Sequence, residues 1–264
     1  MYGAILGDII GSPFEFDKGD KTKDFELFTK GCQFTDDSVM TVAVAEALIA
    51  VGPDATKEEI EDAVTANMQD WGKRYPYAGY GGRFRYWLTS HNPKPYNSYG
   101  NGSAMRVSAV GWLYPTLERT REVAVYTAEV THNHPEGIKG AVATASAIFL
   151  ARIQGKEAML EAMKSYYSQW KEPCLGENRF DETCQGTMPV VFGIIQKANS
   201  FEEAIRYAIA VGGDSDTIGA IVGGIAEAIW GIPEYIRIQT MSYLPNEMVQ
   251  IIEQFNKNIS VDRS

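Results

Sequence analysis

The chain has 264 residues and a formal net charge of −10, from 24 Lys and Arg against 34 Asp and Glu. Hydrophobic residues make up 45% of it and charged residues 22%, a composition that excludes a disordered chain, a collagen and a disulfide scaffold. The acidic excess argues against nucleic acid as the main partner, because binding to a phosphate backbone is favoured by an excess of Lys and Arg.

The cysteine pattern is not typical of a zinc site, and the N-terminal residues are not typical of a signal peptide. The three cysteines are odd in number and form no CxxC pair, so we expect no structural zinc site and a reduced, cytoplasmic setting. Residues 1–16 contain Asp8 and lack a basic start, which is atypical of a signal peptide. No uncharged run reaches the ~20 residues that a membrane-spanning helix needs. We therefore expect no membrane partner, and we expect a monomer.

Apolar residues recur at helical spacing along most of the chain, whereas strand-like alternation is scarce. This periodicity predicts helices at 3–11, 39–50, 57–71, 119–130, 138–153, 156–170, 201–211, 218–229 and 246–255. We expect an all-α fold of roughly a dozen helices, and one domain over residues 1–264 because no linker interrupts the pattern.

Two of these helices carry glycines at a spacing of four residues. Gly3, Gly7 and Gly11 form one run, and Gly219 and Gly223 form another. In a helix, this spacing removes the side chains from one face and lets another backbone approach closely. Acidic residues accompany both runs, so close packing inside a bundle is a better interpretation than a membrane dimer. We expect these two helices to be central.

Two acidic segments stand at the starts of apolar helices. The first is Thr35-Asp36-Asp37-Ser38, and the second is Gly212-Gly213-Asp214-Ser215-Asp216-Thr217. Helix capping is the simpler interpretation, since Thr, Ser and Asp satisfy free backbone N–H groups. One cap needs only one such residue, however, and the surplus carboxylates would repel each other. Two such segments favour a shared site for Mg²⁺, Mn²⁺ or Ca²⁺, with enough oxygen ligands for two ions.

Glu15 lies between Phe14 and Phe16, just after the first glycine-rich helix. It could be a solvent-facing residue of an extended loop. It could instead be a catalytic carboxylate near the metal site, with a pKa raised by the two aromatic neighbours.

The segment from Trp71 to Leu117 contains no Asp or Glu, which predicts an anion-binding face. Its cations are Lys73, Arg74, Arg83, Arg85, Lys94 and Arg106. A long loop ordered by aromatic packing is the alternative interpretation, and long loops are often functional. Within it, Asn97-Ser98-Tyr99-Gly100-Asn101-Gly102-Ser103 leads into a helix near Ala104. This segment could hold a phosphate at the helix start or form an ordinary turn.

Two of the three histidines lie in Thr131-His132-Asn133-His134. They could bind a ligand or simply form hydrogen bonds with the backbone of a loop. Pro135 and Glu136 are typical of the first turn of the next helix. With no third nitrogen or sulfur ligand nearby, a zinc site is not expected here.

Taken in order, these segments resemble the ADP-ribosylglycohydrolases over nearly the whole chain. The matching residues are Gly3 to Asp8, Thr35-Asp36-Asp37, Tyr99 to Gly102 with Ala104-Met105-Arg106, Thr131-His132, and Gly213 to Thr217. The resemblance implies a single compact orthogonal helical bundle with a central cleft that holds two Mg²⁺ or Mn²⁺ ions.

The resemblance also implies roles for individual residues. The metal ligands would be Thr35, Asp36, Asp37, Asp214, Asp216 and Thr217. The diphosphate would lie on Asn97, Ser98, Tyr99, Gly100, Asn101 and Gly102, with His132 in the distal pocket and Tyr99 as a candidate for stacking on adenine. Glu15 matches the glutamate that the serine-directed branch uses in catalysis, and Asp36 or Asp216 is the competing catalytic residue.

The activity implied by the resemblance is hydrolysis of the glycosidic bond between ADP-ribose and an acceptor. Some arginine-directed members carry an extra acidic residue in the middle of the chain, where this sequence has none. The acceptor therefore stays open between arginine, serine and a small ADP-ribosyl compound. Two alternatives remain: a two-metal phosphoesterase acting on the diphosphate, and a non-catalytic module that binds ADP-ribose.

Overall fold

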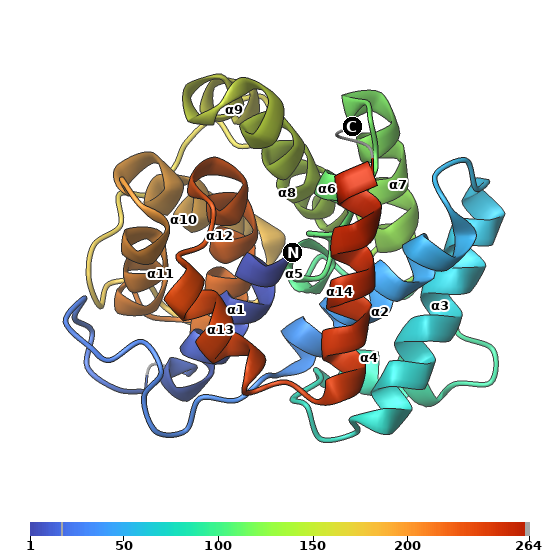
Figure 1. Cartoon of the computed structure of the whole chain (residues 1–264), viewed down its shortest axis with the longest axis horizontal. Coiled ribbons are helices and arrows are strands. Elements are labelled where there is room, and N and C mark those ends of the chain that lie inside the picture. Colours follow the sequence, from blue (N-terminus) through green and yellow to red (C-terminus); the bar gives the residue numbers. More distant parts are fainter. Residues whose placement is uncertain (17, 262–264) are drawn as a thin grey trace.

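The computed structural model describes residues 1–16 and 18–261, with side chains described through residue 259, and within them the fold is all-α (Figure 1). The α-helices are α1 (Tyr2–Gly11), α2 (Asp36–Val51), α3 (Lys57–Arg74), α4 (Gly82–Thr89), α5 (Gly102–Met105), α6 (Val110–Leu113), α7 (Leu117–Glu129), α8 (Pro135–Gln154), α9 (Lys156–Met163), α10 (Cys184–Lys197), α11 (Phe201–Ala210), α12 (Ser215–Trp230), α13 (Glu234–Met241) and α14 (Asn246–Val261). The predicted all-α class is confirmed.

The long predicted helices are present, but the prediction for residues 156–170 is wrong beyond Met163, where α9 ends. The aromatic residues that continued the apolar pattern are used in tertiary packing instead. The rings of Tyr167 and Trp170 have centroids 6.1 and 5.7 Å from that of Phe192 on α10. Periodicity missed α10 itself, which contains Pro189, and it also missed the short helices α4, α6 and α13.

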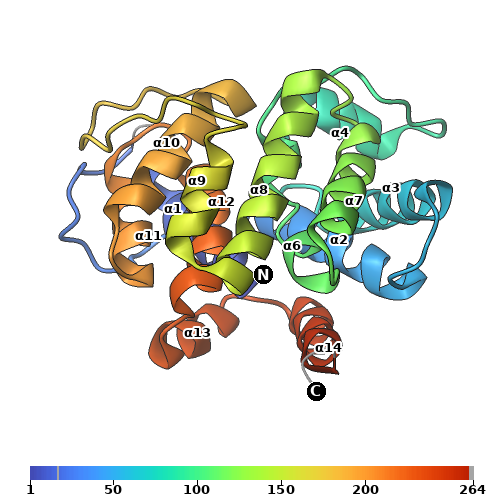
Figure 2. The same ribbon diagram turned by 90° about the horizontal axis from the view of Figure 1, so that it is seen from above.

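The central contact of the fold joins α1 to α12 in an antiparallel pair (Figure 1 and Figure 2). A Cβ atom on Gly3 would lie 2.1 Å from Gly223 O, and one on Gly7 would lie 1.8 Å from Gly219 O. One on Gly11 would lie 2.4 Å from Ser215 O. The two glycine runs therefore pack on each other, and the C-terminal end of α1 meets the N-terminal end of α12.

Figure 2 shows two groups of helices on either side of α8, with α9 to α12 on one side and α2, α3, α4 and α7 on the other. Buried apolar residues form a single cluster through both groups, and residues 140–151 of α8 are buried throughout. This continuous core favours the prediction of one domain over residues 1–264, which stays a prediction. Residues 17 and 262–264 of that range lie outside the described part.

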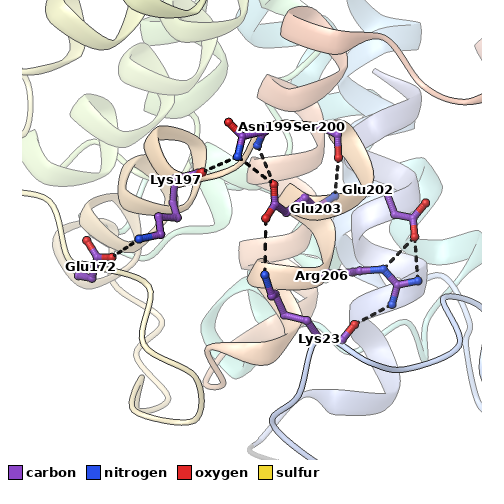
Figure 3. Close-up of polar contacts among 8 residues, drawn as sticks. All are labelled: Lys23, Glu172, Lys197, Asn199, Ser200, Glu202, Glu203 and Arg206. Atoms are coloured by element: carbon purple, nitrogen blue, oxygen red, sulfur yellow. Dashed lines mark hydrogen bonds and ion pairs between the residues drawn. The ribbon is translucent and has the colours of Figure 1, made fainter.

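The segment that follows Glu15 is anchored on α11 by Arg206 (Figure 3). The guanidinium of Arg206 donates hydrogen bonds to the carbonyl oxygens of Lys23, at 2.8 Å, and Phe25, at 2.7 Å. Glu202 pairs with the same guanidinium at 2.8 Å, and Lys23 Nζ lies 3.5 Å from Glu203. These contacts hold the loop between α1 and α2 against the group of helices that contains α12.

Among the helices of the described chain, none combines the length and the apolar character that a bilayer crossing requires.

The glycine contact generates a stability prediction. Replacing Gly7 with Ala would force a methyl group against the backbone of Gly219, and neither backbone can move without shifting a helix. We expect the free energy of unfolding to fall by about 3 kcal/mol or more in chemical denaturation. Gly82→Ala is the control, because a Cβ atom there meets nothing within 4 Å. A Gly7→Ala protein as stable as the control would contradict the close approach.

Candidate metal centre and its cavity

The two acidic segments meet at one end of the α1–α12 pair, and Asp8 of α1 joins them. The Asp8 carboxylate is fully buried and accepts hydrogen bonds from the backbone amides of Thr35, at 2.9 Å, and Ser38, at 3.0 Å. The hydroxyls of the same two residues also donate to it. Asp8 therefore fixes the start of α2 beside the end of α1, and its oxygens are engaged in doing so.

The start of α2 combines a cap with carboxylates that the cap does not use. Thr35 is the N-cap residue, and its hydroxyl oxygen accepts from the Asp37 amide at 3.4 Å. Asp37 Oδ2 lies 3.4 Å from the hydroxyls of both Thr35 and Thr217. Asp37 Oδ1 is buried and has no hydrogen-bond partner among the described residues. Capping thus accounts for Thr35 and leaves a buried carboxylate oxygen unsatisfied.

The start of α12 shows the same surplus of carboxylate groups. Asp214 occupies the N-cap position, but its side chain makes no capping hydrogen bond and instead accepts from Asn101 Nδ2 at 2.7 Å. Asp216 Oδ1 accepts from the Thr217 amide at 2.9 Å. The capping interpretation therefore does not explain Asp214, whereas a shared acidic site uses both residues.

Carboxylate oxygens from these elements form two overlapping groups. One oxygen each from Asp8, Asp37 and Asp216 lie within 4.8 Å of one another, and so do oxygens from Glu15, Asp214 and Asp216. Asp216 belongs to both groups. Asp36 lines the adjoining cavity, and its amide donates to Ala78 O at 2.8 Å. The structure thus brings together residues that lie about 180 positions apart, and these clusters could hold a metal ion.

Burial and mutual repulsion raise the pKa of these carboxyl groups. Burial, followed by the charge of Asp214, raises the pKa of Glu15 to about 7. Burial, followed by the charge of Asp8, raises the pKa of Asp36 to about 8. For Asp37 and Asp216 the pKa lies well above the ordinary value, from burial and then from the charge of a neighbouring aspartate. A hard cation would remove this repulsion and satisfy Asp37 Oδ1, so the oxygen donors fit Mg²⁺ or Mn²⁺.

A cavity of about 370 Å³ opens onto the carboxylates and is lined by side chains of both charges. Its acidic lining residues are Glu15, Asp36, Asp37, Glu182, Asp214 and Asp216. Arg83 and Arg106, both from the acid-free segment, also line the cavity, together with the predicted ligand-binding residues Ser98, Gly100, Asn101, Gly102 and His132. A ligand with an anionic group and a hydroxyl-rich group would find a complementary surface for each.

Two predicted ligand residues do not line this cavity. The Asn97 amide donates to Asn133 Oδ1 at 2.7 Å, and the exposed Tyr99 ring packs edge-on against His134. Two amides of the predicted phosphate cradle are also engaged within the protein. Gly100 N–H donates to Ser98 Oγ at 3.2 Å, and Asn101 N–H donates to Glu182 O at 2.7 Å. Phosphate binding by this segment stays a prediction. The phosphate would have to bind to the donors of the segment that are not already engaged within the protein.

The interpretation of residues 71–117 as one long loop is wrong, because α4, α5 and α6 lie within it. Aromatic packing does order the segment, with the rings of Phe84 and Trp87 stacked at 5.6 Å. The cations of this segment do not all lie at the cavity. Arg74 pairs with Asp70 and Glu247, whereas Arg83 and Arg106 are at the cavity.

The two neighbouring histidines are used differently. His134 caps α8, since its Nδ1 accepts from the Glu136 amide at 3.1 Å, so the interpretation as a loop histidine holds for it. Pro135 and Glu136 form the first turn of α8, as predicted. His132 is buried at the cavity wall, and burial lowers its pKa well below the ordinary value.

Sequence reasoning did not assign a role to Asp8. One available signal was its position, because a single carboxylate stands in the otherwise apolar helix α1. Sequence reasoning also did not select Tyr96, Phe180 and Glu182, which line the cavity. Phe180 and Glu182 lie in an irregular segment that carries no periodic pattern.

Comparison with known proteins gives the same fold and family. A sequence model described as ADP-ribosylglycohydrolase matches residues 1–262. The chain belongs to the ADP-ribosylglycohydrolase family. The family predicted from sequence is thereby confirmed, and the protein is a glycohydrolase, an enzyme that cleaves glycosidic bonds.

Individual relatives are distant but cover most of the chain. ADP-ribosylhydrolase ARH3 of Homo sapiens is 26% identical over 316 residues, covering 89% of this chain and 85% of its own length. ADP-ribosyl-[dinitrogen reductase] glycohydrolase of Rhodospirillum rubrum is 25% identical over 267 residues, covering 88% and 84%. A solved structure titled ADP-ribosylglycohydrolase-related protein complex superposes with a TM-score of 0.68 at 22% identity, covering 99% of this chain and 94% of that one.

The raised pKa values predict how the stability of this glycohydrolase changes with pH when a chelator removes metal ions. The folded site holds protons between the ordinary carboxyl pKa of 3.8 and about 8, where the unfolded chain has released them. Stability must then fall as pH rises through this window. We expect the melting temperature in EDTA to decline from pH 5 to pH 8, and Mg²⁺ to restore it most strongly at pH 8, because metal ligands must be deprotonated.

Asp37→Asn should change both effects. It removes one repelling charge, so the variant in EDTA should be more stable than the wild type at pH 8 and should lose most of the gain from Mg²⁺. Asp62→Asn, at an exposed position of α3, is the matched control. A melting temperature that rises from pH 5 to pH 8 in EDTA, or an unchanged Mg²⁺ gain in Asp37→Asn, would contradict the assignment.

Proposed function

We propose that the chain is a metal-dependent hydrolase that cleaves the glycosidic bond between ADP-ribose and an acceptor, releasing ADP-ribose. The observation that carries the proposal is the cavity of about 370 Å³, which is lined both by carboxylates and by the cations Arg83 and Arg106. The carboxylates would hold a ribose at a metal centre, and the cations would attract a diphosphate. The names of the relatives, which refer to ADP-ribosyl groups, agree with such a ligand.

Two Mg²⁺ or Mn²⁺ ions are the proposed cofactors. Their ligands would be Thr35, Asp36, Asp37, Asp214, Asp216 and Thr217. The two overlapping groups of carboxylates support Asp37, Asp214 and Asp216, and the unsatisfied Asp37 Oδ1 also supports Asp37. Asp8 would position the first three of these ligands, because its own oxygens are taken by Thr35 and Ser38. When bound, such ions supply Lewis-acid stabilisation and lower the pKa of a bound water.

Glu15 is the proposed general acid–base residue. It lies at the cavity, half-buried, with a pKa raised to about 7, so it can exchange a proton near neutral pH. Glycoside hydrolysis passes through an oxocarbenium-like state, in which one carboxyl group protonates the leaving atom or activates water. The carbonyl of the preceding residue, Phe14, accepts from Ser215 Oγ at 2.9 Å, which ties Glu15 to the start of α12. Asp36 and Asp216 are the competing choices for this role.

The remaining lining residues would hold the rest of the ligand. Ser98, Gly100, Asn101 and Gly102 would border the diphosphate, and His132 would border the distal part of the pocket. Asn101 also donates a hydrogen bond to Asp214, so it links this segment to the start of α12. The role of Tyr99 as a stacking partner for adenine would require its ring to leave His134.

The test of the reaction is identification of products. The protein is incubated with peptides ADP-ribosylated on arginine or on serine, with Mg²⁺ and with EDTA, and the products are separated by chromatography. We expect free ADP-ribose from at least one substrate, and only with the metal. AMP as the product would instead support the two-metal phosphoesterase, and ADP-ribose binding without turnover would support a binding module.

The catalytic assignment is tested by comparing two variants at saturating Mg²⁺. Glu15→Gln preserves the shape of the side chain and should lower kcat by about 10²–10⁴-fold, the usual contribution of a general acid–base residue. Its affinity for ADP-ribose should hardly change, because the rest of the cavity is intact. Near wild-type turnover in Glu15→Gln, with none in Asp36→Asn, would move the role to the metal-bound carboxylate.

A further inference from the structure

Arg106 is a buried cation that pairs with no carboxylate of the described residues. Its side chain is only 1% exposed, and it forms no ion pair within residues 1–16 and 18–261. Its Nη2 donates to Thr127 O at 3.0 Å and to Thr131 Oγ1 at 2.8 Å. Burying a charge without a counterion is costly, so this arrangement calls for a role beyond packing.

The contact with Arg106 determines how the Thr131 hydroxyl is oriented. A guanidinium has only donors, so Thr131 Oγ1 must accept from it. The hydroxyl hydrogen is then left to be donated. Among the hydrogen-bonding contacts that this buried hydroxyl makes with described residues, only His132 Nδ1, at 2.7 Å, can accept. Thr131 therefore donates to Nδ1.

This hydrogen bond selects one tautomer of His132. A neutral imidazole whose Nδ1 accepts must carry its proton on Nε2. Burial, followed by the positive charge of Arg106, keeps the ring neutral. Nε2 lies beside the cavity loop, since a Cβ atom placed on Gly102 would be 3.3 Å from it. The cavity wall thus presents one N–H donor of fixed orientation.

We propose that Arg106 and Thr131 are positioning residues that hold His132 in its Nε2–H form, so that it donates a hydrogen bond to an oxygen of the bound ligand. The identity of that ligand as ADP-ribose rests on the proposed function. A fixed donor favours an oxygen acceptor, such as a phosphate or ribose oxygen. It disfavours a ligand that presents a donor at the same point, because two donors would then face each other.

The tautomer is measured first, on the full-length protein without ligand. Long-range nitrogen–proton NMR spectra of the imidazole rings distinguish the two forms, and the signals of His132 are those lost in His132→Gln. We expect Nε2–H in the wild type throughout pH 6–8. Thr131→Ser, which retains the hydroxyl, should keep this form, whereas Thr131→Val should lose the preference. The exposed His91 serves as an internal reference.

Binding is measured next, by calorimetry with ADP-ribose. Thr131→Val should bind about tenfold more weakly, the effect of one net hydrogen bond, and Thr131→Ser should stay within about twofold of the wild type. In turnover, Thr131→Val should raise KM and leave kcat nearly unchanged, because the bond is equally strong in the ground and transition states. A residue with only a structural role would not move the tautomer and KM together.

The outcomes separate this proposal from the proposed function. An Nδ1–H tautomer in the wild type would overturn the positioning role, and that spectrum is recorded on the wild-type protein without a ligand. Wild-type affinity for ADP-ribose in Thr131→Val would overturn the binding role of the fixed donor. Failure of the wild type to bind ADP-ribose at all would overturn the assigned ligand, whatever the tautomer.

Discussion

The site depends on one buried carboxylate in a helix that otherwise packs through glycine. The backbone of α1 lies against that of α12 because Gly7 and Gly219 leave no side chains between them. Asp8, near the end of α1, then bonds the amides of Thr35 and Ser38 and places the start of α2 beside the start of α12. The antiparallel direction brings the ends that carry carboxylates together, and Glu15 follows at the same end.

This arrangement concentrates negative charge at one site, where the charge does not stabilise the fold. Carboxyl groups whose pKa values are raised to about 7 and 8 reflect burial and repulsion rather than paired, stabilising charges. The fold accommodates them because hydrophobic burial elsewhere is continuous through one core. A buried polar atom without a partner, such as Asp37 Oδ1 among the described residues, is the expected sign of a functional site, where local stability is lost in favour of binding.

The sequence predicted the helical class, most long helices and the convergence of the two acidic segments, because periodicity and capping are local signals. It also indicated that each glycine run faces a backbone, but not that the two runs face each other, since pairing is a tertiary property. Asp8 was missed because its partners, Thr35 and Ser38, lie on another element. The predicted end of α9 was wrong because Tyr167 fits the helical periodicity although it lies outside a helix. Its ring packs on Phe192 of α10 instead.

The most direct test of the central claim is anomalous diffraction from crystals of the protein grown with Mn²⁺. The account predicts two anomalous peaks, both among the carboxylates of Asp36, Asp37, Asp214 and Asp216, and their loss in crystals of Asp216→Asn. Full-occupancy peaks elsewhere on the molecule, with none between the starts of α2 and α12, would contradict it.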